Sequence, residues 1–161
     1  MAKEQKTNVM RVLEQKKIAY VPHEYPHGEQ AVDGVTAARL IGRDPACVFK
    51  TLVTVGAGRT NYVFVIPVAR ELDLKKAAKA VGEKSIAMIP VSQLTALTGY
   101  VRGGCSPVGM KKQFPTVFDV SAMTCEQIIV SAGKIGAQIE IAPGELIALL
   151  RGSTADICSE E

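Results

Sequence analysis

Apolar residues recur at helical spacing in several segments of the chain. Thr7 and Asp73 each precede such a segment and can cap a helix there, and Gly82 ends the second one. Ser92 is expected to cap a further helix that stops at Gly99. A short helix is predicted at 36–41, where Gly42 ends it, and a last helix is predicted from Pro143 to about Leu150.

Strand patterns alternate with these helices. Segments 48–55 and 61–68 are rich in β-formers and are joined by a turn with two glycines, which predicts a hairpin. Both segments are apolar on both faces, so they should lie centrally in a sheet. Segment 20–25 predicts an edge strand because it contains Pro22. Shorter strands are predicted at 86–90, 115–120, 126–133 and 137–142.

The order of these elements predicts a mixed α/β (α+β) fold with peripheral helices around one curved mixed sheet. The length of 161 residues suits one domain, which we expect to span 1–152. The last residues, 153–161, read as a polar C-terminal tail.

Composition narrows the classes of function. Aromatic residues make up 5% of the chain and tryptophan is absent, which argues against an extensive stacking surface for single-stranded nucleic acid. The net charge of +3 is compatible with RNA contact without demanding it. No uncharged apolar run approaches the roughly 18 residues of a membrane helix, so a soluble cytoplasmic protein is expected.

The four cysteines, at positions 47, 105, 125 and 158, form no C-x-x-C pair. Without a visible signal peptide, they are expected to be free thiols in a reducing cytoplasm. Cys105 lies in a glycine-rich loop and is a candidate nucleophile, although no histidine is adjacent to it. His23 and His27 are four residues apart, but Pro26 between them argues against a helical metal site, so exposed or loop histidines are expected.

Lys50 lies inside an apolar strand, where a lysine is rarely buried without a partner. One interpretation is an edge lysine whose amine reaches water. The other is a cation at a pocket wall that binds a phosphate, a carboxylate or a developing oxyanion.

Two glycine-rich turns could also contribute to a site. In the segment 102–112 (RGGCSPVGMKK), the glycines and Pro107 favour a backbone that can point N–H groups at an anion or carbonyl oxygen, but a plain connecting turn fits equally well. This segment lacks the Gly-Lys-Ser/Thr of a nucleotide P-loop. Ser131 lies where an apolar strand meets the second turn; it could bind a ligand or simply bond nearby backbone.

Segments 49–53 (FKTLV), 102–112 and 131–143 (SAGKIGAQIEIAP), in this order, resemble the YbaK/ProX family of aminoacyl-tRNA deacylases, in particular its YbaK-type Cys-tRNA(Pro) and Cys-tRNA(Cys) deacylases. The resemblance extends from the first helix to about Leu150. It implies a strongly curved, barrel-like mixed sheet, hydrolysis of aminoacyl-tRNA, and neither a metal nor a cofactor.

The resemblance also assigns roles to residues. It implies that Lys50 holds the 3′-terminal phosphate or ribose of the tRNA, and that the loop with Gly103, Gly104 and Pro107 positions the ester carbonyl. It places four further residues on the pocket wall: Ser131, Tyr25, Thr51 and Gln138. The chain departs from the family at Ala132, where many relatives have glycine, and at Gln138, where some have aspartate. The missing carboxylate argues against Gln138 as a base and could signal a shifted amino-acid preference.

An aminoacyl ester is already reactive, so positioning and oxyanion stabilisation could suffice, with water or the substrate's own thiol as attacker. The expected partner is the 3′ end of aminoacyl-tRNA, with prolyl-tRNA synthetase as a further candidate, and neither DNA nor a membrane. The sequence leaves two rivals open: a non-catalytic tRNA- or nucleotide-binding module of the same fold, and a Cys105 thiol enzyme.

Overall fold

The computed structural model describes residues 6–28 and 32–160. The α-helices are α1 (Asn8–Gln15), α2 (Gly34–Leu40), α3 (Leu74–Val81), α4 (Val91–Thr98) and α5 (Pro143–Leu150). Two short 3₁₀ helices are η1 (Pro45–Cys47) and η2 (Val120–Thr124). The strands are β1 (Val21–Glu24), β2 (Phe49–Gly56), β3 (Asn61–Pro67), β4 (Ile86–Met88), β5 (Thr116–Asp119), β6 (Ile128–Lys134), β7 (Ala137–Ile141) and β8 (Ser153–Ala155).

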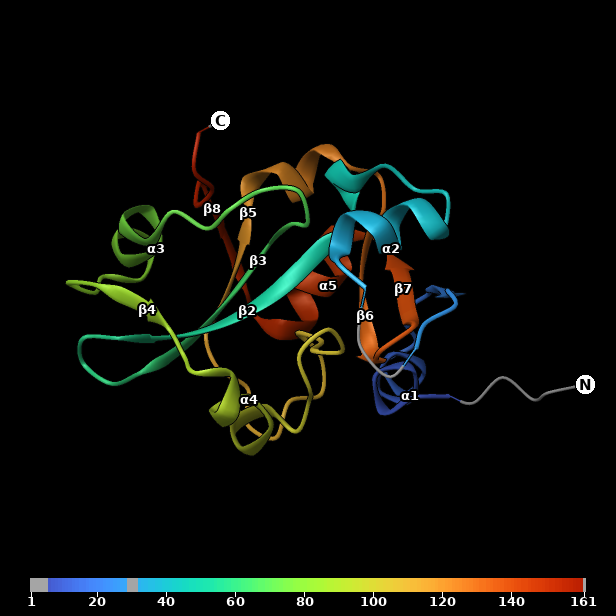
Figure 1. Cartoon of the computed structure of the whole chain (residues 1–161), viewed down its shortest axis with the longest axis horizontal. Helices are drawn as coiled ribbons and strands as arrows, with labels where there is room; N and C mark the ends of the chain where they lie inside the picture. Colours follow the sequence, from blue (N-terminus) through green and yellow to red (C-terminus); the bar gives the residue numbers. More distant parts are fainter. Residues whose placement is uncertain (1–5, 29–31, 161) are drawn as a thin grey trace, which may run out of the picture.

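The strands form two sheets, which lie side by side in Figure 1. The larger sheet has the order β4-β2-β3-β5-β8, with β2 antiparallel to β3 and β4, and with β5 parallel to β3 and β8. The smaller, antiparallel sheet has the order β1-β7-β6. The mixed α/β prediction is confirmed, but the expectation of one barrel-like sheet is wrong, because neither sheet in the described part of the chain closes.

The predicted hairpin is confirmed as β2 and β3, and both of its faces are covered. Val63 and Val65 of β3 belong to a core that continues into β6, β7, α1 and α5. Phe64 and Ile66 point to the other face, where they pack with Ala77 of α3 and with the end of the chain. Two cores, one on each face, explain why these strands are apolar throughout.

The predicted N-caps of α1 and α3, Thr7 and Asp73, are confirmed. The Thr7 hydroxyl accepts a hydrogen bond from the Met10 N–H at 3.3 Å, and the Asp73 carboxylate accepts from the backbone at the start of α3. The prediction for Ser92 is wrong: α4 begins at Val91 with Pro90 at its N-cap, and no side chain caps it. Within the described residues, no helix is long and apolar enough to cross a membrane.

The predicted polar tail is part of the fold as far as Cys158. Strand β8 pairs in parallel with β5, and the side chains of Ile157 and Cys158 are fully buried. Polar Ser153 and Thr154 lie in an exposed edge strand, which explains why this segment resembles a tail. Glu161, the last residue of the predicted tail, lies outside the described residues.

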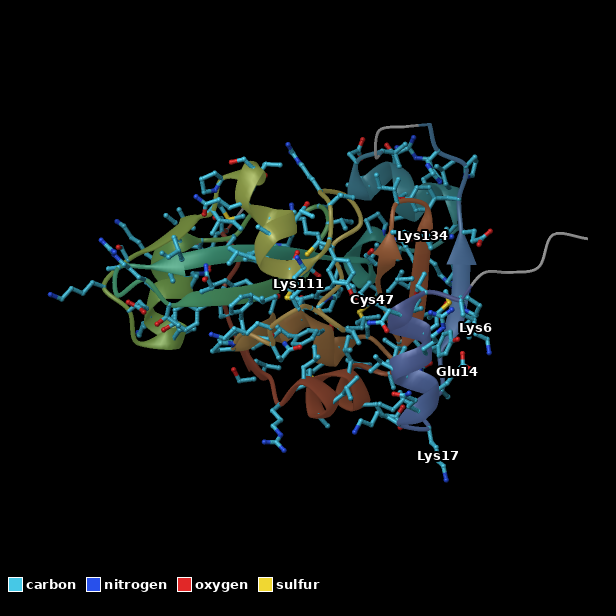
Figure 2. All side chains as sticks on the ribbon, turned by 90° about the horizontal axis from the view of Figure 1, so that it is seen from below. Lys6, Glu14, Lys17, Cys47, Lys111 and Lys134 are labelled. Carbon is cyan, nitrogen blue, oxygen red and sulfur yellow. A yellow bond between two sulfur atoms is a disulfide. The ribbon has the colours of Figure 1, made fainter. Side chains whose placement is uncertain are left out.

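The prediction of four free thiols is wrong for two of them. Cys47 and Cys125, separated by 78 positions, form a disulfide with a Cα–Cα distance of 6.1 Å. Val48 and Ile129 form a parallel bridge close by, so the junction of the two sheets brings these cysteines together. Figure 2 shows Cys47 in the middle of the molecule, between the strands of the two sheets. Cys105 and Cys158 are free and buried.

Candidate active site

Lys50 lies in the first half of β2, opposite Ile66 of β3. Just before it, Val48 bridges to Ile129 of β6, so Lys50 lies where the two sheets meet. Its side chain is partly buried, and it forms no ion pair with any described residue. A cation placed in this way is available to bind an anionic group of a ligand.

A cavity of about 140 Å³ opens beside this lysine, and we call it the Lys50 pocket. It is lined by Tyr25, Val32, Gly34, Ala37, Phe49, Lys50, Thr51, Val68, Gly103, Cys105, Ser131 and Gln138. Six of the eight predicted site residues therefore come together, from β2, β6, β7 and two loops; Gly104 and Pro107 do not line the pocket. None of the described lining residues is acidic.

The glycine-rich loop forms a tight turn at the edge of this pocket. The Gly104 N–H donates to the Val101 carbonyl oxygen at 3.0 Å, and Gly103 inside the turn has φ +86°. A positive φ at this position of a turn favours glycine. The N–H groups of Gly103 and Cys105 form no hydrogen bond with a described residue, whereas that of Gly104 is used within the turn.

Gly104 matters for packing instead. A Cβ on Gly104 would lie 2.9 Å from the backbone nitrogen of Ile135 and 3.0 Å from the carbonyl carbon of Lys134. Both atoms belong to the turn between β6 and β7, so the absence of a side chain lets the two glycine-rich turns touch. Pro107 is buried in the same loop, away from the pocket lining.

The loop is held in place by Tyr100. Its hydroxyl donates to the Val108 carbonyl oxygen at 2.5 Å, and its own carbonyl oxygen accepts from the Thr95 hydroxyl at 2.9 Å. Burial raises the pKa of Tyr100 to about 12, so the hydroxyl keeps its proton at neutral pH. The backbone that carries Gly103 is therefore fastened at both ends of the loop.

The three-stranded sheet also contributes to the pocket lining, through Ser131 and Gln138. Gln138 of β7 lies directly opposite Ser131 of β6 on one side and His23 of β1 on the other. Residues opposite each other in antiparallel strands share a face, so these side chains form one row. The Ser131 hydroxyl accepts from the Gly133 N–H at 3.1 Å. Two oxygens of pocket residues, Thr51 Oγ1 and Gln138 Oε1, are buried and have no hydrogen-bond partner in the described part of the chain.

The two histidines have separate environments. His23 Nε2 lies 2.7 Å from Glu140 Oε1, which also accepts from Arg43 Nε at 3.2 Å. His27 is exposed and bonds the Gly28 carbonyl oxygen. The expectation of exposed or loop histidines therefore fits His27, whereas His23 lies in a strand and is partly buried. Burial acts to raise the pKa of Glu140, but the hydrogen bonds from His23 and Arg43 outweigh it and lower that pKa.

Cys105 is unsuited to be a nucleophile. It is 8% exposed, and burial raises the pKa of its thiol to about 12, although a hydrogen bond with Thr98 acts in the opposite direction. The thiolate is the reactive form of cysteine, so a thiol with this pKa is almost fully protonated at pH 7.

A second cavity, of about 280 Å³, adjoins the Lys50 pocket and was not predicted from the sequence. The two cavities share Thr51, Gly103 and Cys105. The rest of the lining of the second cavity is mostly apolar and comes from β2, β4 and α4, with exposed Arg102 at its edge. The only signal for it in the sequence is the series of apolar residues in 88–94, which reads as ordinary core.

Comparison with known proteins places this chain in a family. A model of the aminoacyl-tRNA editing domain matches residues 29–149. The chain is 48% identical over 158 residues to a candidate Cys-tRNA(Pro)/Cys-tRNA(Cys) deacylase, EbsC, of Enterococcus faecalis, and the match covers 98% of this chain and 96% of that protein.

Two solved structures share the fold. One is a candidate trans-editing enzyme for prolyl-tRNA synthetase, with a TM-score of 0.82 and 26% identity, covering 98% of this chain and 100% of that one. The other is a hypothetical protein, with a TM-score of 0.85 and 21% identity, covering 95% of this chain and 100% of that one. Since the family model covers most of the chain and a curated relative matches nearly all of it, the chain belongs to the aminoacyl-tRNA editing domain family.

Proposed function

We propose that this protein is a trans-editing hydrolase that cleaves the ester bond of mischarged aminoacyl-tRNA, with Cys-tRNA(Pro) and Cys-tRNA(Cys) as substrates. The observation that carries the proposal is a lysine that forms no ion pair with any described residue and that lines a small pocket together with Gly103 and Cys105 of the glycine-rich loop. A pocket of about 140 Å³ is well below the roughly 300 Å³ at which ordinary ligand sites begin, which favours a small acyl group. The name of the Enterococcus faecalis relative supports the same substrates.

In this mechanism, Lys50 holds the 3′-terminal phosphate or ribose of the tRNA and thereby brings the ester to the pocket. The N–H groups of Gly103 and Cys105 donate to the carbonyl oxygen as it becomes negative, since donors fixed in advance stabilise an oxyanion. The Gly104 N–H is not one of these donors, because it bonds the Val101 carbonyl oxygen within the turn. Ser131, Tyr25, Thr51 and Gln138 bind the aminoacyl group.

The attacking group is water or the thiol of a cysteinyl substrate. In the second case the sulfur bonds the carbonyl carbon, the carbon–oxygen bond to the ribose breaks, and the ribose oxygen takes the thiol proton. The product is a thiolactone that water opens to free cysteine. Either route relies on orientation more than on a strong protein base.

Replacing Lys50 tests the assignment directly. Lys50→Ala should lower kcat/KM for Cys-tRNA(Pro) by at least 100-fold, because an anchored ester loses much of its rate when its orientation is lost. Lys84→Ala, which removes an exposed lysine that does not line the pocket, serves as the matched control and should retain wild-type activity. Full activity of Lys50→Ala would contradict the proposed mechanism.

A substrate panel separates the proposed enzyme from a binding module. Purified protein is incubated with labelled Cys-tRNA(Pro), Cys-tRNA(Cys) and Ala-tRNA(Pro), and release of the amino acid is measured. No release from any of them, with tRNA binding retained, would favour the non-catalytic module. Loss of release on Cys105→Ser would favour the thiol enzyme, whereas we expect little change because Cys105 is a buried, protonated thiol.

We further propose that recognition of the tRNA body depends on prolyl-tRNA synthetase. A net charge of +3 on 161 residues gives this chain a weak electrostatic grip on a whole tRNA. Binding of tRNA by the protein alone should be weak, and addition of the synthetase should strengthen it and change its salt dependence. Identical binding with and without synthetase would contradict this part of the proposal.

A further inference from the structure

Two buried oxygens of residues that line the Lys50 pocket, Thr51 Oγ1 and Gln138 Oε1, have no hydrogen-bond partner among the described residues, 6–28 and 32–160. Gln138 is 8% exposed, so bulk water does not satisfy its amide oxygen. Buried polar atoms in folded proteins are nearly always hydrogen-bonded, and exceptions call for an explanation. Both residues line the same cavity, from strands of different sheets, so a ligand in that cavity can supply the missing donors.

The other residues of the pocket limit which donor is left for these two oxygens. Lys50, Gly103 and Cys105 line the same pocket, and their amine and backbone N–H groups are the proposed partners of the tRNA end and the ester carbonyl. In an aminoacyl ester, the carbon next to that carbonyl carries the α-amino group. This group is therefore the nearest N–H donor to any bound carbonyl, whatever the side chain of the amino acid is.

The charge of the pocket determines the form of the amino group. Lys50 is cationic, and none of the described lining residues is acidic, so an ammonium group would meet a like charge without a carboxylate to offset it. An unperturbed α-amino group has a pKa of roughly 8, so its neutral form is accessible near neutral pH. A neutral amine has two N–H groups, which match two neutral acceptors, an amide oxygen and a hydroxyl oxygen.

We propose that Gln138 and Thr51 form a subsite for the free α-amino group of the acyl moiety. The pocket thereby selects esters of free amino acids over acyl groups that lack this amine. The inference rests on the proposed function and adds a specificity rule to it. The selection is independent of the amino-acid side chain, because every α-amino acid presents the same group at the same place.

The test compares Cys-tRNA(Pro) with 3-mercaptopropionyl-tRNA(Pro), which keeps the thiol and lacks only the amine. Each kcat/KM is divided by the rate of spontaneous hydrolysis of the same ester, because the amine also changes its intrinsic reactivity. Wild-type protein should prefer the cysteinyl ester by at least tenfold after this correction. Gln138→Met, which keeps the shape but removes the acceptor, should bring the preference close to one by slowing only the cysteinyl ester.

Thr51→Val removes the second acceptor at constant shape and should reduce the preference in the same way. Gln127→Met, at an exposed position before β6, is the matched control and should retain the wild-type preference. Circular dichroism reports whether each variant is folded, and Thr51→Val still tests the subsite if Gln138→Met fails to fold.

The outcomes separate the two levels of the proposal. If wild-type protein hydrolyses neither ester, the proposed function fails and the subsite fails with it. If wild-type protein hydrolyses both esters with equal corrected rates, the function stands and the subsite is refuted. The subsite is also refuted if folded Gln138→Met and Thr51→Val slow both esters equally, since that is the behaviour of residues with a structural role only.

Discussion

Asp119, at the end of β5, offers a sharp test of how the C-terminal segment is held. Its side chain is 2% exposed, and its carboxylate accepts hydrogen bonds from the Ile157 N–H at 3.2 Å, the Ser121 N–H at 3.2 Å and the Ser121 hydroxyl at 2.5 Å. Asp119→Ala leaves the buried Ile157 N–H without a partner, which costs about 2 kcal/mol. Asp119 is also the N-cap of η2, and loss of its hydrogen bond from the Ser121 N–H adds about 1 kcal/mol to the cost in unfolding free energy.

The variant should therefore lose about 3 kcal/mol of unfolding free energy, which for a chain of this size lowers Tm by roughly 6–12 °C. Urea unfolding followed by far-UV circular dichroism measures the loss. Asp156→Ala is the control in the same segment: that side chain is 68% exposed and pairs with Lys76 on the surface, so the change should cost less than about 1 kcal/mol. A loss below about 1 kcal/mol for Asp119→Ala, with an unchanged m-value, would refute this account.

The same residue predicts a dependence on pH. Burial acts to raise the pKa of Asp119, but the hydrogen bonds from Ser121 and Ile157 outweigh it and lower that pKa. A carboxyl group with a lowered pKa in the folded state stabilises the fold above its unfolded pKa of about 3.9, and this contribution is lost as the pH falls below that value. The difference in stability between wild type and Asp119→Ala should therefore shrink between about pH 4 and pH 2.

Three further changes test other parts of the molecule. Gly104→Ala should cost about 1–3 kcal/mol in urea unfolding, because the new Cβ meets the Ile135 nitrogen at 2.9 Å; a cost near zero would show that the two turns can separate freely. Glu140→Gln should cost about 1–2 kcal/mol at pH 7, and the difference from wild type should shrink as the pH falls below about 4, because the pKa of Glu140 is lowered in the fold. The disulfide between Cys47 and Cys125, 78 positions apart, should stabilise the fold by about 4.5 kcal/mol at 25 °C through the chain entropy that it removes from the unfolded state. Dithiothreitol should therefore lower the unfolding free energy of the wild type by this order and leave that of the Cys47→Ser/Cys125→Ser variant unchanged. An equal effect of dithiothreitol on both proteins would contradict this prediction.

The sequence predicted features that depend on short stretches of chain. Thr7 and Asp73 cap helices because their side chains bond backbone only two or three residues away. Lys50 was predicted as a candidate because one charge interrupts an apolar strand, and in the structure it lines a cavity and forms no ion pair with the residues described. Gln138 was predicted as a pocket residue only from the family resemblance, because its place in the pocket depends on the register of β7 with β1 and β6.

Features that depend on distant contacts were missed. Cys47 and Cys125 carry no spacing signal, because the bridge between Val48 and Ile129 brings them together. Strand β8 was read as a tail because an edge strand of Ser153–Ala155 has no apolar pattern of its own. The hydrogen bond from the Gly104 N–H to the Val101 carbonyl oxygen could not be predicted from the sequence either. A glycine in a loop is compatible with a free N–H group as well as with a bonded one.

The Cys47–Cys125 disulfide also changes the connectivity of the molecule. It closes the chain between these two cysteines into a covalent ring from which the N-terminal and C-terminal segments leave as two arms. Lys50 belongs to the ring, whereas Ser131 and Gln138 belong to the C-terminal arm, so the Lys50 pocket lies where ring and arm meet. A protease cut inside the ring, for instance in the turn at 57–60, would leave a single covalent particle until the disulfide is reduced. The redox state of one cysteine pair thus decides whether such a nick can release one wall of the pocket from the other.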